Sequence, residues 1–303
     1  MTLVELKYLL TLAQEGHFGR AAKRCHVSQP TLSVSISKLE AQLGISLFER
    51  HKNHIRITEI GEKLVIQAQR VLEEAEKFQN LASGSGNQLD SPLKLGGIHT
   101  IAPYLFPALI PELRKLAPEM PLIINEDLTS NLSLKLQRGD LDAIFISLPF
   151  KEPSVVVKAL YEEPFMVLLP KDHPLSKKST VSREALSHEK TLLLGRGHCF
   201  RDQILKHCPQ CYNPEELQQT VEGTSLETLR HMVASGLGIT ILPSTATQVK
   251  HYSKSLCARP FNTKIPKRTV ALAWRVSFPR TKAIDKLIQA LDKAKLSSIC
   301  PID

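Results

Sequence analysis

The segment from Phe18 to Leu43 has the hydrophobic pattern of two helices joined by a tight turn. Ser28 is suited to cap the second helix, and Pro30 is tolerated in a first helical turn. The apolar residues of that helix recur at spacings of four, three and four and share one face: Leu32, Ile36, Leu39 and Leu43. The other face carries small polar and basic side chains of the kind that enter the major groove of DNA: Thr31, Ser33, Ser35 and Lys38.

A basic segment follows this helix after Gly44. Residues 47–57 have the pattern of a hairpin, and Arg50, Lys52 and Arg56 within it are suited to phosphates. Phosphate contacts position a protein on DNA without reading its sequence. A helical hairpin with a solvated basic loop is the alternative that spacing alone leaves open.

A long amphipathic helix is predicted from Thr58, a suitable N-cap, to near Ala82. Its apolar residues alternate at spacings of four and three over about three heptads, which favours the pairing of two helices. These residues are Leu64, Ala68, Val71, Ala75, Phe78 and Ala82. A single amphipathic helix docked on its own domain is the alternative. Residues 83–87 then have the Ser/Gly composition of a flexible linker.

Beyond the linker, short apolar strands alternate with helices. Strands are predicted at 93–98, 122–128, 141–148, 165–169, 191–194, 239–242 and 269–274, and helices at 105–116 and 132–137. This alternation is typical of an α/β fold with parallel sheets covered on both faces. Such sheets bind ligands at the carboxyl ends of their strands.

Composition and charge indicate a class of partner. The 303 residues carry a net charge of +9, which suits a polyanion. Residues 1–58 hold four Lys and four Arg against four Glu, so the positive charge is densest where the two helices lie. The chain has no apolar run of about 18 residues and no basic region before an apolar run at its start. We therefore expect a cytoplasmic protein, where a disulfide would act as a switch rather than a staple.

The N-terminal helices resemble those of a known family. The string A-A-x-x-x-x-V-S-Q-P-T-L-S-x-x-I-x-x-L-E-x-x-L-G-x-x-L-F-x-R, from Ala21 to Arg50, is similar to the winged helix-turn-helix of LysR-type transcription regulators. The resemblance implies that the helix from Ser28 reads the major groove, that Arg50 lies in the wing, and that the long helix dimerises the protein. It further implies a two-lobed regulatory domain resembling periplasmic binding proteins, and binding to promoter DNA as a tetramer of paired dimers.

The resemblance and the pattern together divide the chain into three parts. Residues 1–58 form the DNA-binding domain, 59–89 the dimerisation helix and hinge, and 90–303 the regulatory domain. The lobes of the regulatory domain are residues 90–161 with 267–303, and residues 162–266. The residues expected to contact DNA are Gln29, Pro30, Thr31, Ser33, Lys38, Arg50 and Lys52.

One of the six cysteines has distinctive surroundings. Cys199 follows a strand and a Gly turn and opens a predicted helix, whose dipole favours the thiolate. Arg196, His198 and Arg201 are nearby cations that favour the thiolate in the same way, and the thiolate is the reactive form. Three other cysteines lack such neighbours and are expected to be inert: Cys25, Cys257 and Cys300.

The surroundings of Cys199 resemble one branch of the LysR family, the OxyR regulators that sense hydrogen peroxide. The matching strings are G-H-C-x-R-D-Q at 197–203, followed by Cys208, and T-S-L-E-T-L-R at 224–230. The resemblance implies that peroxide oxidises Cys199 to a sulfenic acid, that Cys208 resolves it as a disulfide, and that oxidative-stress genes are then activated. It also implies RNA polymerase as a partner, and a regulator rather than an enzyme, with no cofactor or metal. The implied peroxide pocket comprises Thr100, Thr129, His198 and Arg268, with Lys267 as the alternative to Arg268.

The spacing of the cysteines makes a disulfide informative. Nine residues separate Cys199 from Cys208, so on one helix they would be about 13 Å apart at ~1.5 Å per residue. A disulfide needs Cα atoms about 5.5–6 Å apart. Bond formation must therefore melt or rebuild the helix, which is what a redox switch requires. Cys211 forms a C-x-x-C with Cys208 and is an alternative resolver, and with His207 this pair is also a candidate metal cluster.

Two other functions stay open on the sequence alone. A LysR regulator can sense a small organic effector between its lobes, with Cys199 incidental. The C-x-x-C can instead belong to a thiol redox enzyme, although here it follows a helix rather than opening one. Gly195 and Arg196 also stand where acidic residues are expected in OxyR regulators, which changes the charge beside the thiol.

Overall fold

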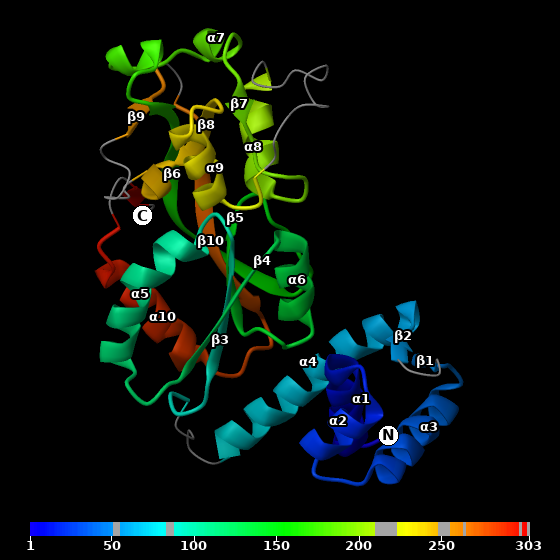
Figure 1. Cartoon of the computed structure of the whole chain (residues 1–303). Helices are drawn as coiled ribbons and strands as arrows, with labels where there is room; N and C mark the ends of the chain where they lie inside the picture. Colours follow the sequence, from blue (N-terminus) through cyan, green and yellow to red (C-terminus); the bar gives the residue numbers. More distant parts are fainter. Residues whose placement is uncertain are drawn as a thin grey trace.

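The structure, a computed structural model, describes residues 1–50, 55–82, 88–209, 223–247, 255–262, 265–296 and 299–301. A helical N-terminal part lies at one end of the molecule and a larger α/β part at the other, with a long helix between them (Figure 1). The elements of the N-terminal part are α1 (Leu3–Glu15), α2 (Phe18–Arg24), α3 (Gln29–Leu43), β1 (Phe48–Arg50) and β2 (Ile55–Ile57).

Local signals set the ends of the N-terminal helices. Thr2 and Glu5 form a reciprocal capping box at the start of α1. The Ser28 hydroxyl accepts a hydrogen bond from the N–H of Thr31 at the start of α3. Gly44 ends α3 with a φ of 68°, a conformation that glycine adopts at no steric cost. The predicted helix-turn-helix is confirmed, and β1 pairs antiparallel with β2 as its wing.

The apolar face of α3 packs as predicted except at its end. Leu32, Ile36 and Leu39 are buried in the N-terminal core, together with residues of α1 and α2. Leu43 is 40% exposed instead, because it is the last residue of the helix and lies beyond the packed face.

The apolar residues predicted to pair along helix α4 (Glu59–Ala82) lie in two different environments. Ala68 is buried in the N-terminal core and Leu64 packs against that core, so this end of the helix docks on its own domain. Val71 and Phe78, further along, are 37% and 75% exposed. The docked-helix alternative therefore holds for the first turns, and pairing with a second helix stays a prediction for the exposed stretch.

The α/β part contains one path of paired strands in the order β4-β3-β5-β10-β6-β8-β7, with β9 and β11 also paired to β6. Its strands are β3 (Leu93–Ile98), β4 (Leu122–Asp127), β5 (Ala143–Ser147), β6 (Val155–Pro170), β7 (Thr191–Leu192), β8 (Ile239–Pro243), β9 (Leu256–Pro260), β10 (Lys267–Arg275) and β11 (Cys300–Pro301). Its helices are α5 (Ala102–Leu116), α6 (Thr129–Gln137), α7 (Arg183–Leu186), α8 (Cys199–His207), α9 (Leu226–Ala234) and α10 (Thr281–Lys293), with short 3-10 helices η1 (Pro174–Lys177) and η4 (Ser244–Thr247). No helix in the described part of the chain is long and apolar enough to cross a membrane.

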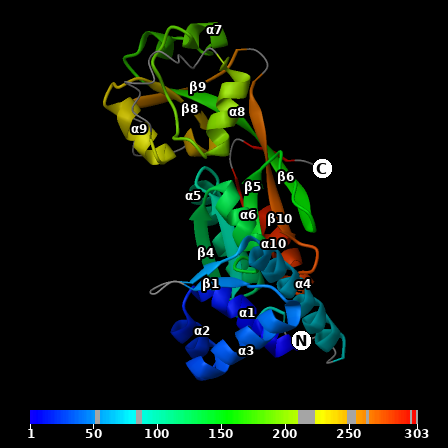
Figure 2. The same ribbon diagram turned by 90° about the vertical axis from the view of Figure 1, so that its right-hand side faces the viewer.

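Two lobes with separate cores form along strand β6. Its first half pairs with β10, and from Phe165 onward it pairs with β8 and β9. One core is built on β3, β5, β10, α5 and α10, and the other on β7, β8, α8 and α9. Figure 2 shows the two lobes stacked along these strands, above the N-terminal part. The expected two-lobed regulatory architecture is thus confirmed.

The sheet is mixed, whereas the sequence predicted parallel sheets. β3 pairs in parallel with β4 and β5, and β7 with β8. β10 runs antiparallel to β5 and β6, and β6 runs antiparallel to β8. The reason is the route of the chain. It leaves the first lobe along β6 and returns along β10, so these two neighbouring strands run in opposite directions.

A buried ion pair ties α4 to the first lobe. The Glu73 carboxylate on α4 accepts hydrogen bonds from Nε of Arg275, at 2.8 Å, and from the hydroxyl of Ser277, and it lies 2.7 Å from Nη2 of Arg275. Arg275 ends β10 and also donates to the carbonyl oxygens of Leu136, at the end of α6, and of Leu141. One guanidinium group therefore holds the linker helix, a strand end and a helix end together.

Candidate functional sites

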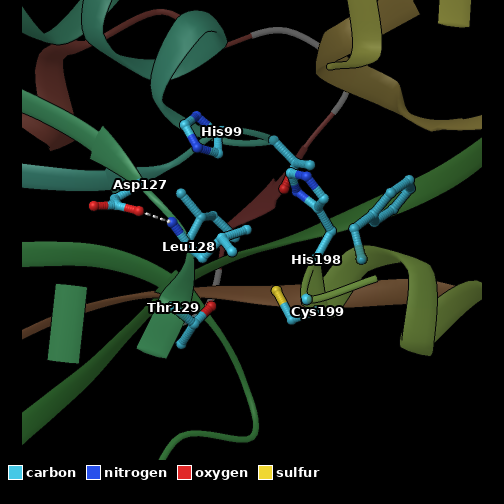
Figure 3. Close-up of a pocket in the computed structure, with 10 residues that line it drawn as sticks. His99, Asp127, Leu128, Thr129, His198 and Cys199 are labelled. Carbon is cyan, nitrogen blue, oxygen red and sulfur yellow. Dashed lines mark hydrogen bonds between the residues drawn. The ribbon is translucent and has the colours of Figure 1, made fainter. Parts of the chain in front are cut away.

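A small pocket lies where the lobes meet, at the carboxyl ends of β3 and β4 and the start of α8 (Figure 3). Residues 98–100, 127–129 and 197–200 line it. Its volume of ≈ 10 Å³ is about what a single water-sized molecule needs. A pocket for a drug-sized organic ligand measures about 300 Å³ or more. The volume therefore restricts this pocket to a very small ligand.

Thr129 offers the pocket a hydroxyl group without a partner. It is the first residue of α6, and its Oγ1 is buried with no hydrogen-bond partner among the described residues. A buried polar atom left unpaired costs about 1–3 kcal/mol. A guest that bonds this hydroxyl would recover that free energy.

Asp127 fixes the turn between β4 and α6, from which Thr129 projects. Its carboxylate accepts hydrogen bonds from the N–H of Leu128, from Nδ2 of Asn131 and from Nζ of Lys135. Partial burial opposes the charge, but these bonds outweigh it and lower the pKa of Asp127 to about 2. The turn is therefore held by a carboxylate that stays ionised at neutral pH.

Thr100 and Arg268 form the buried wall behind the pocket. Arg268 donates from Nη1 to Oγ1 of Thr100 at 2.8 Å and from Nη2 to its carbonyl oxygen at 2.7 Å. Its Nε donates to Glu163 at 2.8 Å, and the side chains of both partners are fully buried. Lys267, the alternative from the sequence, is an exposed residue that pairs with Glu162. Arg268 thus orients Thr100 and does not itself line the pocket.

Two histidine rings lie close together at the pocket. The ring centroids of His198 and His99 are 5.8 Å apart. Burial, and then the neighbouring His99, lower the pKa of His198, so its imidazole is neutral at neutral pH. A neutral imidazole can exchange hydrogen bonds with a guest. The sequence analysis predicted that a positively charged His198 favours the Cys199 thiolate. That charge is absent at neutral pH.

Cys199 opens α8 and is a half-buried free thiol that packs against the core of the first lobe. The cations expected around it are placed differently. Arg201 is buried and donates from Nη1 to the carbonyl oxygen of Leu194 at 2.6 Å, and Arg196 is exposed to solvent, which screens its charge. The start of α8 adds positive potential at the thiol.

Cys208 lies at the other end of α8, in the core of the second lobe, with an exposure of 1%. The two cysteines are thus at opposite ends of one helix and belong to different cores. Cys208 forms a disulfide that does not include Cys199, since Cys199 is free. Cys211 lies outside the described residues. Within the described ranges, no group of three or more His, Cys, Asp or Glu is placed to bind a metal ion.

Helix α8 also bridges the lobes through Gln203. Its Nε2 donates to the hydroxyl of Ser147 at 2.8 Å and to the carbonyl oxygen of Leu148 at 3.1 Å, both in the first lobe. Any rebuilding of α8 that brings its ends together must break these bonds.

The polar face of α3 is exposed, as a groove-reading surface must be. Exposed positions on the helix include Gln29, Pro30, Thr31, Val34, Ser37 and Lys38, whereas Ser33 and Ser35 are half-buried. The Thr31 hydroxyl is hydrogen-bonded to Ser28 at 2.7 Å, and Lys38 lies 3.7 Å from the carboxylate of Glu5. The side chain of Arg50 and the whole of Lys52 lie outside the described residues.

The sequence reasoning missed three residues that shape the pocket: His99, Asp127 and Glu163. His99 and Asp127 lie at the carboxyl ends of β3 and β4, the position where such sheets bind ligands. That rule could have found both residues. Glu163 lies within β6 and carries no local signal, because its role depends on Arg268 from a strand about a hundred residues later.

Comparisons with known proteins agree with this geometry. Residues 3–62 match the family described as "Bacterial regulatory helix-turn-helix protein, lysR family", and residues 86–295 match "LysR substrate binding domain". The chain is 38% identical over 291 residues to the "Hydrogen peroxide-inducible genes activator" of Dickeya chrysanthemi, covering 96% of this chain and 95% of that protein. It is 37% identical, with the same coverage, to the "DNA-binding transcriptional dual regulator OxyR" of Escherichia coli K12.

Solved structures give the same result. A full-length OxyR variant from Pseudomonas aeruginosa is 53% identical, with a TM-score of 0.91 over 98% of this chain and 96% of that chain. A hydrogen peroxide-bound OxyR mutant from Corynebacterium glutamicum is 33% identical, with a TM-score of 0.64 over 97% of this chain and 92% of that chain. These relatives are transcription regulators, so the thiol-enzyme alternative is not supported. The chain belongs to the LysR family of DNA-binding transcription regulators and, within it, to the OxyR group.

Proposed function

We propose that this protein is a transcription activator that senses hydrogen peroxide through Cys199. The observation that carries the proposal is the water-sized pocket that combines the free thiol of Cys199 with the unpartnered hydroxyl of Thr129. Hydrogen peroxide is about as small as the pocket requires and can both donate and accept hydrogen bonds. An organic effector in this pocket is disfavoured by the same volume.

The chemistry follows from the residues present. The Cys199 thiolate attacks one oxygen of hydrogen peroxide, so that an S–O bond forms as the O–O bond breaks. The leaving hydroxide takes up a proton and departs as water, and Cys199 becomes a sulfenic acid. In this proposal Thr129 and His198, which line the pocket, hold the peroxide by hydrogen bonds, and the bond from Arg268 to Thr100 keeps Thr100 oriented.

The switch is the rebuilding of α8. The Cys208 thiol attacks the sulfenic acid, which forms the disulfide and releases water. Since Cys208 is disulfide-bonded here, an external thiol reductant must first cleave that bond by thiol–disulfide exchange, which frees the Cys208 thiol and oxidises the reductant to its own disulfide. Closure then brings together residues about 13 Å apart on the helix, so α8 cannot persist and Cys199 or Cys208 must leave its core.

The DNA-binding role uses the N-terminal part. Residues 1–58 contact promoter DNA through α3 and the wing, residues 59–89 pair two chains, and residues 90–303 carry the sensor. Two such dimers form the tetramer, and RNA polymerase is the expected partner at activated promoters. The exposed apolar stretch of α4, with Val71 and Phe78, supports the pairing surface.

The test is chemical trapping in the reduced full-length protein. A dimedone-type probe is added with a slight excess of peroxide, and the labelled peptides are mapped by mass spectrometry. Label is expected first on Cys199, followed by a 199–208 disulfide when the probe is omitted. Cys199→Ser is the matched control and should take up no early label. Early label on Cys208 or Cys211 with Cys199 unmodified contradicts the proposal.

A further inference from the structure

The exposed face of α3 carries an apolar side chain that the fold does not use. Val34 is 68% exposed, although it lies in the middle of a 15-residue helix whose buried stripe includes Leu32 and Ile36 on either side of it. Valine is also a weaker helix former than alanine or the unbranched side chains. Neither burial nor helix propensity accounts for a valine at this position.

Val34 lies in a shallow hollow on the surface of the N-terminal part. The hollow is lined by Glu5, Pro30, Thr31, Val34, Ser35 and Lys38. Its α3 residues recur at spacings of three and four, so they share one face of the helix. Val34 is central on that face, with Thr31 one turn before it and Lys38 one turn after it.

The N-terminal part that carries this hollow has a net positive charge, with four Lys and four Arg against four Glu in residues 1–58, which suits a polyanion. Lys38 lines the hollow and pairs with Glu5, while Arg20 and Arg24 on α2 pair with Glu15. The side chains of these three cations are 63%, 62% and 51% exposed. An apolar protein partner is expected to need a contiguous apolar patch of some hundreds of Å² rather than one valine among polar and basic residues. Nucleic acid is therefore the partner that the face fits better.

We propose that Val34 is a specificity-determining residue that recognises thymine through its C5-methyl group in the major groove. The proposal rests on the proposed role of α3 in DNA binding. In the major groove thymine presents a methyl group at C5, where cytosine carries only a hydrogen atom, and small apolar side chains distinguish thymine by contact with that methyl. Thr31 lies one turn before Val34 and is the neighbouring polar contact to the DNA. Its hydroxyl is also hydrogen-bonded to Ser28.

Removing methyl groups from each of the two partners tests this contact. The probe is a duplex that the full-length protein selects from a random library, together with copies in which one thymine at a time is replaced by deoxyuridine. Deoxyuridine lacks only the C5-methyl group. Affinity is measured by fluorescence anisotropy for the wild type, Val34→Ala and Val34→Thr. Val34→Ala favours the helix and Val34→Thr keeps the shape of the side chain, so both variants should fold, which circular dichroism verifies.

The wild type should lose about fourfold in affinity at one thymine of each half-site, the equivalent of ~0.8 kcal/mol for one buried methyl group. Val34→Ala should bind the thymine duplex about fourfold more weakly and be indifferent to uracil at that position. Val34→Thr, which keeps one methyl group, should fall between the two. Thr31→Ala is the matched control: it should weaken binding without changing the ratio between thymine and uracil.

Several results would overturn the assignment. Val34→Ala with wild-type affinity, or with an undiminished preference for thymine, would show that Val34 does not contact the methyl group. Unchanged DNA affinity with an altered oligomeric state in sedimentation would assign Val34 to a protein contact instead. If the wild type selects no sequence from the library, the proposed DNA-reading function fails and this assignment fails with it.

Discussion

Replacing Arg275 with Met should release helix α4 from the first lobe. The Arg275 side chain is 5% exposed, lies 2.7 Å from the Glu73 carboxylate and donates to the Leu141 carbonyl oxygen at 2.5 Å. Removing one partner of a buried ion pair leaves the other charge uncompensated and costs about 3–5 kcal/mol. The fraction of molecules with α4 undocked should then rise more than about 100-fold.

Hydrogen exchange followed by mass spectrometry measures this opening in the full-length protein. A chain with several domains need not unfold in one step, so local exchange is more informative than a single melting temperature. Peptides from the second half of α4 should exchange faster in Arg275→Met, while peptides from the core strand β3 should not change.

Two further variants test whether loss of the buried ion pair causes the faster exchange of α4. Lys63→Met removes an exposed ion pair with Glu59 on the same helix and should leave the exchange of the second half of α4 unchanged. The double variant Glu73→Met with Arg275→Met removes both charges of this pair and should regain part of the protection. Wild-type exchange of α4 in Arg275→Met alone would refute the reasoning.

Three more predictions concern the sensor. Gln203→Leu should speed formation of the 199–208 disulfide after peroxide, because two hydrogen bonds that hold α8 to the first lobe are lost, and a quenched time course that is unchanged or slower would count against this role. Cys208→Ser should let Cys199 reach the sulfenic acid without forming the 199–208 disulfide, and only the double variant with Cys211→Ser should lack every disulfide to Cys199 if Cys211 also resolves, which peptide mapping decides. The lowered pKa of Asp127, about 2 against 3.8, means that its stabilisation is present above about pH 4 and lost as the pH falls through about 2. Asp127→Asn should flatten acid denaturation across that window, and an identical acid profile for both proteins would contradict this.

Short-range signals made the N-terminal part predictable. The caps at Ser28 and Gly44 and the buried stripe of α3 depend on residues within a few positions of each other, so the sequence contained them in full. The same holds for Cys199 at the start of a helix, because a strand, a Gly turn and a helix follow each other directly. α10 was missed by the sequence reasoning, although its apolar residues have helical spacing and could have been read.

Pairings between distant segments could not be predicted. Arg268, and not Lys267, contacts Glu163 and Thr100, because its side of β10 faces them. Which side faces them is set by the pairing of β10 with β6 rather than by neighbours in the chain. The antiparallel crossing of β6 and β10 likewise follows from a return of the chain about a hundred residues later.

The sequence by itself determined that Cys199 and Cys208 are nine residues apart on a helix, and hence that a bond between them must rebuild it. Only the tertiary structure decided that Cys199 packs against one lobe and Cys208 within the other, and that Arg201 bonds a backbone carbonyl near the thiol. Burial and the direction of a long side chain depend on surfaces built from remote parts of the chain. Local pattern therefore fixes the spacing of the switch, and packing fixes the environment of each of its ends.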